Sequence, residues 1–160
     1  MLYSHLDSPL GELLAVGDGR AISGLHMQEG QTAIAVQPGW QPADEPFAAL
    51  RAQLAEYFAG ARTTFDLPLA LAGSPFQLRV WRALQDIPYG ATTRYGALAR
   101  RIGVPSAARA IGVANGQNPV CVIVPCHRVI GADGSLTGYG GGLERKRLLL
   151  DLEAGALPLA

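Results

Sequence analysis

The amino-acid sequence predicts an α+β protein, with a strand-rich first part and a mostly helical second part. In the first part, residues 11–27 hold two apolar runs separated by Asp18-Gly19, a pair that favours a turn between strands. In the second part, apolar residues recur at helical spacing around one apolar run, 120–124, which we expect to be a buried strand. The 160 residues are 49% apolar, which is enough for a folded core.

A change in charge marks the expected domain boundary near Gly73. Residues 1–75 hold three basic side chains against eight acidic ones. Residues 76–160 hold ten basic side chains, nine of them arginine, against five acidic ones. We therefore predict two domains, 1–73 and 74–160. The basic excess of the second favours a nucleic-acid surface, although solvated arginines on an ordinary surface explain it equally well.

The other elements of the first domain follow from spacing and turn residues. Residues 37–46 are rich in Pro, Gly and Asp and predict a loop. The apolar residues that then recur at helical spacing are Phe47, Leu50, Leu54, Tyr57 and Phe58. They predict a helix that ends before Gly60, and residues 63–69 are expected to form one more edge strand.

Three helices are expected at the start of the second domain. Ser74, which a proline follows, can cap the first. Thr93 can cap a second, short helix that ends at Gly103, and Ser106 can cap a third over 107–115. The last two are joined by a short turn and have the shape of a helix-turn-helix unit.

Arg109 is the expected exposed cation of the third helix. The residues that predict its buried side are Ala107, Ala110, Ile111 and Ala114. At about 100° per residue, Arg109 lies nearly opposite them. The small neighbouring side chains would let this helix approach a nucleic-acid groove closely, but an ordinary exposed arginine explains the pattern as well.

Cys126 stands beside His127 in "VIVPCHRVIG", residues 122–131. A disulfide with Cys121 is disfavoured, because an extended 120–124 would separate the two Cα atoms by roughly 16 Å and a bridge needs less than ~7 Å. A zinc site is disfavoured, because the candidate ligands are few and no CxxC or HxxxH spacing occurs. A buried inert thiol and a nucleophile both stay open.

A nucleophilic Cys126 needs a base, and His127 is adjacent in sequence. Neighbouring side chains of a strand face opposite ways, so contact requires a turn at Pro125 or an intervening water molecule. Glu153 is a candidate to orient the histidine, because it lies on an apolar helix face where an unpaired charge is costly. A Glu153 that simply lies in solvent near the chain end is the alternative.

The segment "NPVCVIVPCHRVIG" resembles the active-site motif of the O6-alkylguanine-DNA alkyltransferases, also called methylated-DNA–protein-cysteine methyltransferases. The resemblance extends over "PFQLRVWRALQDIPYGATTRYGALARRIG", "AARAIGVANGQNP" and "GYGGGLERKRLLLDLE", and so covers nearly all of residues 75–153. The N-terminal part is similar only in layout and in "SPLG". The resemblance implies a small ribonuclease H-like α/β domain followed by a winged helix-turn-helix domain.

The resemblance also implies catalytic roles. Cys126 would accept the alkyl group from guanine O6, with His127 as its base through a water molecule and Glu153 orienting the histidine. Tyr95 would donate a proton to guanine N3. Asn118 would hold the turn that carries the cysteine.

The implied substrate contacts involve the base pocket and the duplex. Tyr139 would wall the pocket, and backbone groups of Cys126, Val129 and Gly140 would bind the guanine edge. Arg109 would enter the duplex in place of the flipped nucleotide. The small residues expected at the same DNA surface are Ser106, Ala107 and Ala110.

The implied function is DNA repair by stoichiometric, irreversible transfer of the alkyl group from O6-alkylguanine in double-stranded DNA to the protein's own cysteine after base flipping. O4-alkylthymine stays open as a second substrate, since Gly140, a serine in some relatives, would leave more room. The alternative is a non-enzymatic alkyltransferase-like lesion-binding protein, but such relatives lack the acceptor cysteine. A cysteine hydrolase and a sequence-specific winged-helix regulator have less support.

No cofactor and no metal are expected, because the zinc site of some relatives needs an N-terminal cysteine and none precedes Cys121. The apolar runs are shorter than the ~20 residues of a membrane span. Residues 1–20 lack the pattern of a secretory signal, and two cysteines suit a reducing compartment. We therefore expect a cytoplasmic monomer, with cooperative binding along DNA left open.

Overall fold

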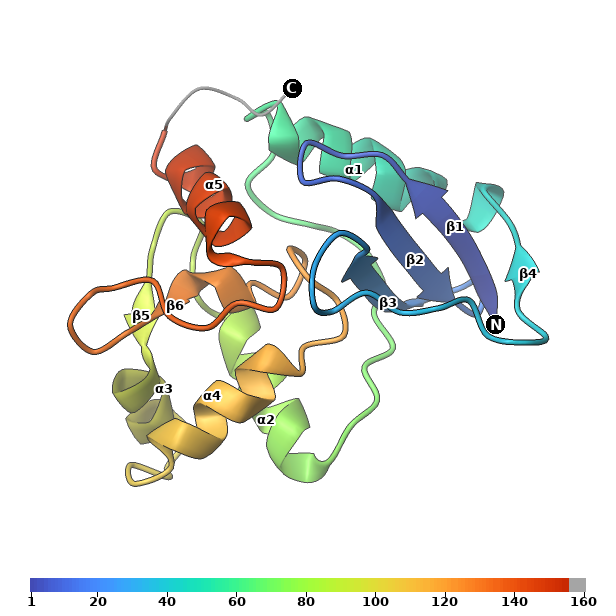
Figure 1. Ribbon diagram of the computed structural model, residues 1–160. Helices are drawn as coiled ribbons and strands as arrows, with labels where there is room; N and C mark the ends of the chain where they lie inside the picture. The colour runs from blue at the N-terminus through green and yellow to red at the C-terminus, as the bar shows by residue number, and fades with distance from the viewer. Residues whose placement is uncertain (156–160) are drawn as a thin grey trace.

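A mixed four-stranded sheet with one helix against it forms the N-terminal part of the chain, and a group of helices forms the rest (Figure 1). A computed structural model describes residues 1–155. The sheet has the spatial order β3-β2-β1-β4. Its strands are β1 Leu2–Leu6, β2 Leu13–Gly17, β3 Ile22–Met27 and β4 Gln41–Pro42. Antiparallel pairs join β1 to β2 and β2 to β3, whereas β4 runs parallel to β1.

The turn predicted at Asp18-Gly19 is confirmed. The carboxylate of Asp18 accepts hydrogen bonds from the backbone N–H groups of Arg20 and Ala21, at 2.8 and 2.9 Å. Gly19 has a φ of +95°, which favours glycine because it has no Cβ. This turn therefore connects β2 to β3 and fixes their register.

The helix predicted to end before Gly60 is also confirmed. A short 3-10 helix, η1 (Glu45–Phe47), leads into α1 (Ala48–Phe58), which covers one face of the sheet (Figure 1). All five apolar residues that predicted this helix are buried. Gly60 follows it with a φ of +77°. The helix therefore closes the core of the N-terminal part.

Two predictions for the N-terminal part need correction. Residues 63–69 form no strand, because Pro68 lacks an N–H group and Gln53 of α1 bonds both the N–H and the C=O of Asp66. Only an isolated bridge links Leu69 to Ile22. The predicted loop 37–46 includes the two residues of β4 and the start of η1.

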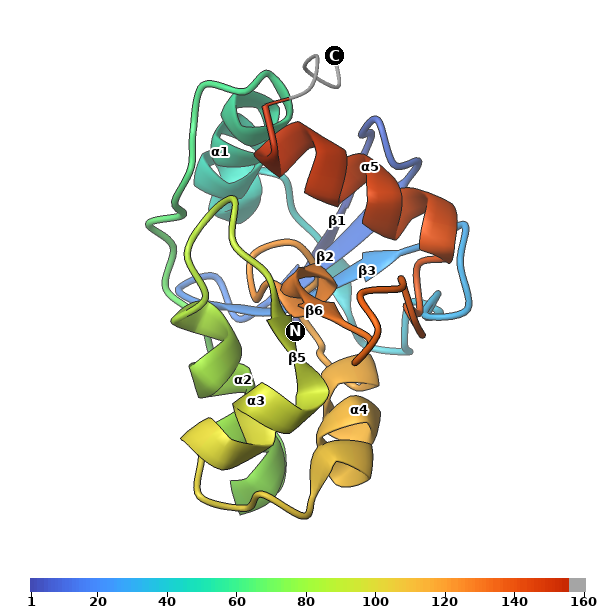
Figure 2. The same ribbon diagram turned by 90° about the vertical axis from the view of Figure 1, so that its left-hand side faces the viewer.

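The second part of the chain consists of helices around a short parallel strand pair (Figure 2). Its elements are α2 Pro75–Gln85, β5 Thr93–Arg94, α3 Tyr95–Arg101, α4 Ala108–Gly116, η2 Cys126–Arg128, β6 Val129–Ile130 and α5 Leu143–Glu153. The predicted cap at Ser74 is confirmed, because its hydroxyl accepts from the N–H of Gln77, whose side chain bonds back to Ser74. The α+β fold class is confirmed as well.

The other two predicted caps are wrong. Thr93 belongs to β5, where it pairs with Val129, and Arg94 precedes α3 without a side-chain cap. Ser106 lies two residues before α4, whose cap position is Ala107. Pairing between β5 and β6 thus overrides the local preference of Thr93 for a cap.

The buried strand predicted at 120–124 is wrong. Val120 makes an isolated bridge to Leu25, and the chain then turns, with the N–H of Val124 donating to the carbonyl of Val120 at 3.0 Å. Val122 has a φ of +68°, a conformation that a β-branched residue adopts only under constraint. The apolar run is therefore a tight buried turn that leads into η2.

The last residues of the second predicted domain, 156–160, lie outside the described part of the chain. Within residues 1–155, no helix is long and apolar enough to cross a membrane.

Candidate active site

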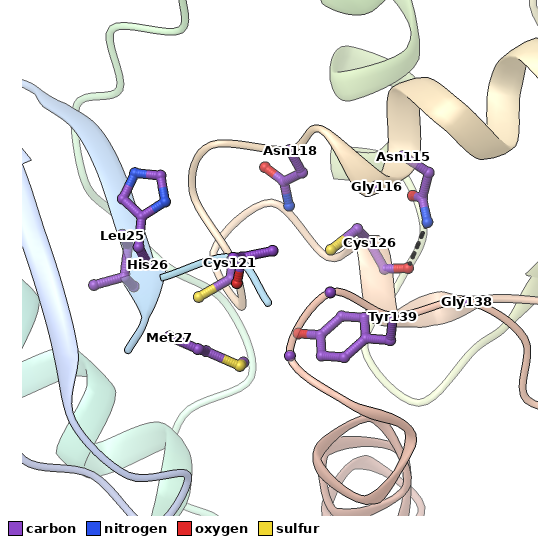
Figure 3. Close-up of a pocket in the computed structure, with 13 residues that line it drawn as sticks. Leu25, His26, Met27, Asn115, Gly116, Asn118, Cys121, Cys126, Gly138 and Tyr139 are labelled. Atoms are coloured by element: carbon purple, nitrogen blue, oxygen red, sulfur yellow. Dashed lines mark hydrogen bonds between the residues drawn. The ribbon is translucent and has the colours of Figure 1, made fainter. Parts of the chain in front are cut away.

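Cys126 begins the 3-10 helix η2 and is buried, with an exposed fraction of 6%. Two asparagines hold the turn around it. Asn118 donates to the carbonyl of Val124 at 2.8 Å and accepts from the N–H of Val120 at 3.0 Å. Asn115 of α4 donates to the carbonyl of Cys126 at 3.2 Å (Figure 3). Asn118 was predicted to hold this turn, whereas the contribution of Asn115 was not predicted.

Glu153, near the end of α5, is the centre of a buried hydrogen-bond network. Its carboxylate lies 2.8 Å from Nε2 of His127 and accepts from the hydroxyl of Tyr57 at 2.6 Å. The guanidinium of Arg128 donates to it at 2.7 and 3.0 Å and to the carbonyl of Ile87 at 2.6 Å. The side chain of Glu153 is 1% exposed and that of His127 is fully buried. Glu153 therefore does not lie in solvent.

The network fixes the charge of its members. Burial alone would raise the pKa of Glu153, but the hydrogen bonds from His127 and Arg128 outweigh it and lower this pKa to about 2. Burial lowers the pKa of His127, although the nearby carboxylate partly offsets this. At neutral pH the imidazole is therefore neutral and the carboxylate ionised.

This charge state leaves one imidazole nitrogen available as a base. Since Nε2 faces an ionised carboxylate, we assign its proton there, and Nδ1 then carries a lone pair. Nδ1 is buried and has no hydrogen-bond partner among residues 1–155. Such an imidazole can take a proton at Nδ1, and Glu153 would stabilise the resulting cation.

The environment of the Cys126 thiol has opposing effects on its pKa. Burial raises the pKa, while the Asn118 amide and the charge of Lys146 oppose the rise. Lys146 of α5 is itself fully buried and donates to the carbonyls of Val129 and Thr137 at 2.6 and 2.8 Å. The resting thiol is therefore protonated, and it needs a base to become a nucleophile.

A small cavity of about 20 Å³ adjoins Cys126 and has room for about one water molecule (Figure 3). Residues from both parts of the chain border it, among them Met27, Thr32, Asn118, Cys121, Tyr139 and Gly140. Two buried polar atoms at this cavity, Oδ1 of Asn115 and the hydroxyl of Tyr139, have no hydrogen-bond partner among the described residues. A ligand that enters the cavity therefore meets one free acceptor and one free donor.

Other candidate residues lie outside this cavity. Tyr95, at the start of α3, packs over Gly112 of α4 and directly follows β5. Val129 is fully buried in β6, the partner of β5, so this strand pair ties the start of α3 to η2. Neither side chain borders the cavity in the part of the chain described.

The candidate DNA-contacting residues lie at or before the start of α4. Arg109 is exposed, as predicted, and so are Ser106 and Ala110, while Ala107 is half-buried. The predicted burial of Ala110 is wrong, because the buried side of α4 consists of Ile111, Ala114 and Asn115. Ala110 is therefore free to join Arg109 on an outer surface.

Several site residues were missed by sequence reasoning. Tyr57 was predicted only as a core residue, and the roles of Arg128 and Lys146 were not predicted. Asn115 stands three residues before Asn118, and this i, i+3 spacing of two amides beside an apolar turn was a usable signal. The contact of Tyr57 with Glu153 spans 96 positions, so no local pattern could have indicated it.

The fold and the site define a protein with a buried thiol and an oriented imidazole beside a helix-turn-helix unit. Two family models match the chain. One is described as "6-O-methylguanine DNA methyltransferase, ribonuclease-like domain" and matches residues 1–71. The other is described as "6-O-methylguanine DNA methyltransferase, DNA binding domain" and matches residues 75–155. The chain therefore belongs to the 6-O-methylguanine DNA methyltransferase family, which confirms the resemblance found in the sequence.

Individual relatives agree with this assignment. A methylated-DNA–protein-cysteine methyltransferase of Mycobacterium tuberculosis is 53% identical over 156 residues, which cover 98% of this chain and 94% of the relative. One of Methanosarcina acetivorans is 47% identical, over 96% of this chain and 98% of the relative. A crystal structure of Mycobacterium tuberculosis OGT in complex with DNA has a TM-score of 0.92 and 51% identity, and covers 99% of this chain and 96% of that one.

Proposed function

We propose that this protein repairs O6-alkylguanine in double-stranded DNA by transferring the alkyl group to Sγ of Cys126. The observation that carries the proposal is the buried thiol at a cavity, in the same 3-10 helix as an imidazole that a carboxylate orients. The Cys126 thiolate attacks the alkyl carbon and forms a carbon–sulfur bond. The carbon–O6 bond breaks, and its electron pair goes to the guanine.

The thiol proton leaves through His127. Nδ1 of His127 is the free basic atom, and a water molecule between it and Sγ of Cys126 would carry the proton. Glu153 then stabilises the imidazolium, with Tyr57 and Arg128 holding the carboxylate in place. Tyr95 is assigned the proton transfer to guanine N3, because β5 and β6 link the start of α3 to η2.

The base has to leave the duplex to reach this thiol. A cavity of about 20 Å³ cannot hold a purine, so the pocket must widen when the flipped base enters. Arg109 on α4 is exposed and would replace the flipped nucleotide in the stack. Ser106, Ala107 and Ala110 are small enough to let the helix approach the DNA backbone closely.

The transfer is a single event for each protein molecule, because a thioether is a poor leaving group. We propose a cytoplasmic protein that acts as a monomer and needs no cofactor, with domains of residues 1–73 and 74–160. O4-alkylthymine is proposed only as a secondary substrate. The non-enzymatic lesion-binding alternative is not favoured, because Cys126 is present and both family models match the chain.

Mass spectrometry after incubation with duplex DNA that contains O6-methylguanine tests the acceptor. One methyl group on Cys126 is expected in the wild-type protein and in Cys121→Ala, and none in Cys126→Ser. Circular dichroism on each sample verifies the fold. An unmodified Cys126 in folded wild-type protein would contradict the proposal, and stable binding of the damaged DNA without transfer would favour the alternative.

Replacement of Arg109 by alanine tests base flipping. The variant should repair duplex DNA more slowly and still react with free O6-benzylguanine, which needs no flipping. Arg20→Ala is the matched control, because Arg20 is an exposed arginine on the β2–β3 turn. An equal loss on duplex DNA and on the free base would refute the flipping role of Arg109.

A further inference from the structure

The segment that connects β3 to the rest of the N-terminal part reaches across to the loop before α5. Residues 28–34 form a closed loop, because the Gln28 side chain donates to the carbonyl of Ile34 at 2.7 Å and accepts from its N–H at 3.1 Å. The N–H of Gln31 donates to the carbonyl of Gly140 at 3.0 Å. The tip of this loop is therefore attached to the cavity wall around Cys126.

A second contact holds the two loops together. Arg145 of α5 donates to the carboxylate of Glu29 at 3.0 Å and to the carbonyl of Gly141 at 2.9 Å. The backbone of Gly140 and Gly141 also lies so close to Gly30 that a Cβ there would meet the Gly140 carbonyl oxygen at 3.0 Å. Thr32 is thus held in a defined position at the cavity.

Thr32 occupies the space of the side chain that Gly140 lacks. A Cβ built on Gly140 would lie 2.2 Å from Cγ2 of Thr32, far inside van der Waals contact. Gly140 is not among the glycines with positive φ, so its backbone conformation would accept a side chain. The constraint at Gly140 is therefore space, and the extra room expected from this glycine is filled by a methyl group of the N-terminal part.

We propose that Thr32 is a specificity-determining residue that limits the size of the group transferred to Cys126. The inference deepens the proposed function and rests on it, because a group that reacts with Sγ of Cys126 has to lie in the cavity that Thr32 borders. Thr32 and Gly140 share one volume, so the side chain at one position sets what the other tolerates. The N-terminal part thus selects the substrate although the acceptor lies in the C-terminal part.

The test is a double-mutant cycle at positions 32 and 140. The rate of transfer is measured by mass spectrometry with two substrates, O6-methylguanine in duplex DNA and free O6-benzylguanine. Thr32→Ala should raise the benzyl-to-methyl rate ratio about tenfold, since a pocket discriminates by roughly this factor for each methyl-sized change. Thr32→Val keeps both branches at Cβ and replaces only the hydroxyl with a methyl group, so it should leave the ratio within about twofold of wild type.

The reverse change and the combination complete the cycle. Gly140→Ser should lower the rate with O6-benzylguanine about tenfold, because its Cβ and the Thr32 methyl group would compete for the same space. Adding Thr32→Ala to Gly140→Ser should recover most of this loss, since the two residues are directly coupled. Thermal denaturation of all variants separates altered specificity from altered folding.

The results separate this inference from the proposed function. Absence of methyl transfer in the wild-type protein overturns the proposed function itself. Methyl transfer together with an unchanged ratio in Thr32→Ala overturns the role of Thr32 alone. Independent effects of Thr32→Ala and Gly140→Ser in the double variant also overturn it, because they would mean that the two positions share no space.

Discussion

The two sides of Cys126 differ in how completely their polar groups are bonded. Toward α5 and α1, the carboxylate of Glu153 is hydrogen-bonded to three residues of two elements, Tyr57 of α1 and His127 and Arg128 of η2. Toward the cavity, Asn115 and Tyr139 each leave a buried polar atom without a partner among the described residues. On the first side, which we call the bonded side (Tyr57, His127, Arg128 and Glu153), Nδ1 of His127 alone lacks a partner among the described residues, and it is the atom available for proton transfer. The cavity side keeps unused bonding capacity for a ligand.

Among the substitutions considered, Glu153→Gln is expected to disrupt the hydrogen-bond network of the bonded side most severely. It leaves the Arg128 guanidinium buried without its counter-charge, which typically costs about 3–5 kcal/mol of unfolding free energy. The rate of alkyl transfer should fall as well, because His127 loses the anion that stabilises its protonated form. Urea denaturation and single-turnover kinetics measure the two effects.

Glu144→Gln is the matched control for this variant. Glu144 lies on the same helix, α5, but it is exposed. Its replacement should change the unfolding free energy by less than about 0.5 kcal/mol. Equal destabilisation by the two variants would remove the distinction between the bonded side and an ordinary surface.

Tyr57→Phe should have the next largest effect, since it removes one hydrogen bond from the same carboxylate. A hydrogen bond to a charged group contributes about 1.5–3 kcal/mol, so the unfolding free energy should fall by this amount. The benzyl-to-methyl rate ratio should stay unchanged, because Tyr57 does not border the cavity. Tyr3→Phe, at a half-buried tyrosine of β1, is the control. A changed ratio in Tyr57→Phe would show that the two sides are not independent.

Acid should weaken the bonded side in two stages. The pKa of His127 is lowered in the folded state, so below about pH 6.5 the unfolded chain binds more protons than the folded protein. The unfolding free energy therefore decreases as the pH is lowered below 6.5. The pKa of Glu153 is lowered from 4.5 to about 2, so its contribution is present above pH 4.5 and is lost as pH falls toward 2.

The unfolding free energy as a function of pH measures these stages. Each proton contributes a slope of at most about 1.4 kcal/mol per pH unit. Burial also lowers the pKa of His26, so a His26→Gln variant is needed to isolate the contribution of His127 to the pH dependence. A flat profile between pH 6.5 and 5 in that variant would contradict a buried neutral His127.

Cys121→Ala should have the smallest effect and tests the cavity side. Cys121 borders the same cavity as Cys126 and lies in the apolar run 120–124 that was expected to be a strand. Burial raises its pKa strongly, so it stays a thiol at neutral pH. The variant should lose about 1 kcal/mol of stability or less and should still accept one methyl group at Cys126. A second methyl group, on Cys121 of the wild-type protein, would show that the cavity does not distinguish its two thiols.

Local sequence signals predicted the elements whose bonds are local. The Asp18-Gly19 turn and the Ser74 cap depend on residues within three positions, and both are confirmed. Thr93 and Ser106 carry equally good cap signals and fail. For Thr93 the reason is the pairing of β5 with β6, 36 positions away, which no local pattern shows.

The surroundings of Cys126 were predictable only in part, for a similar reason. The apolar run 120–124 has the composition of a strand, yet Asn118 bonds its two ends and closes it into a turn. That change places Cys126 and His127 in a 3-10 helix, where the alternation expected of a strand no longer holds. Tyr57 and Thr32 reach the site from the first part of the chain, which the motif around Cys126 does not include.

The position of α5 in the chain has a consequence during synthesis. A growing chain that extends to η2 already holds Cys126 and His127, but Glu153 and Lys146 follow only in α5. Until that helix emerges from the ribosome and packs against α1, the imidazole has no carboxylate to orient it. The oriented imidazole therefore forms only after α5 has been synthesised and has packed, so a chain that extends only to η2 lacks the geometry that we propose for alkyl transfer.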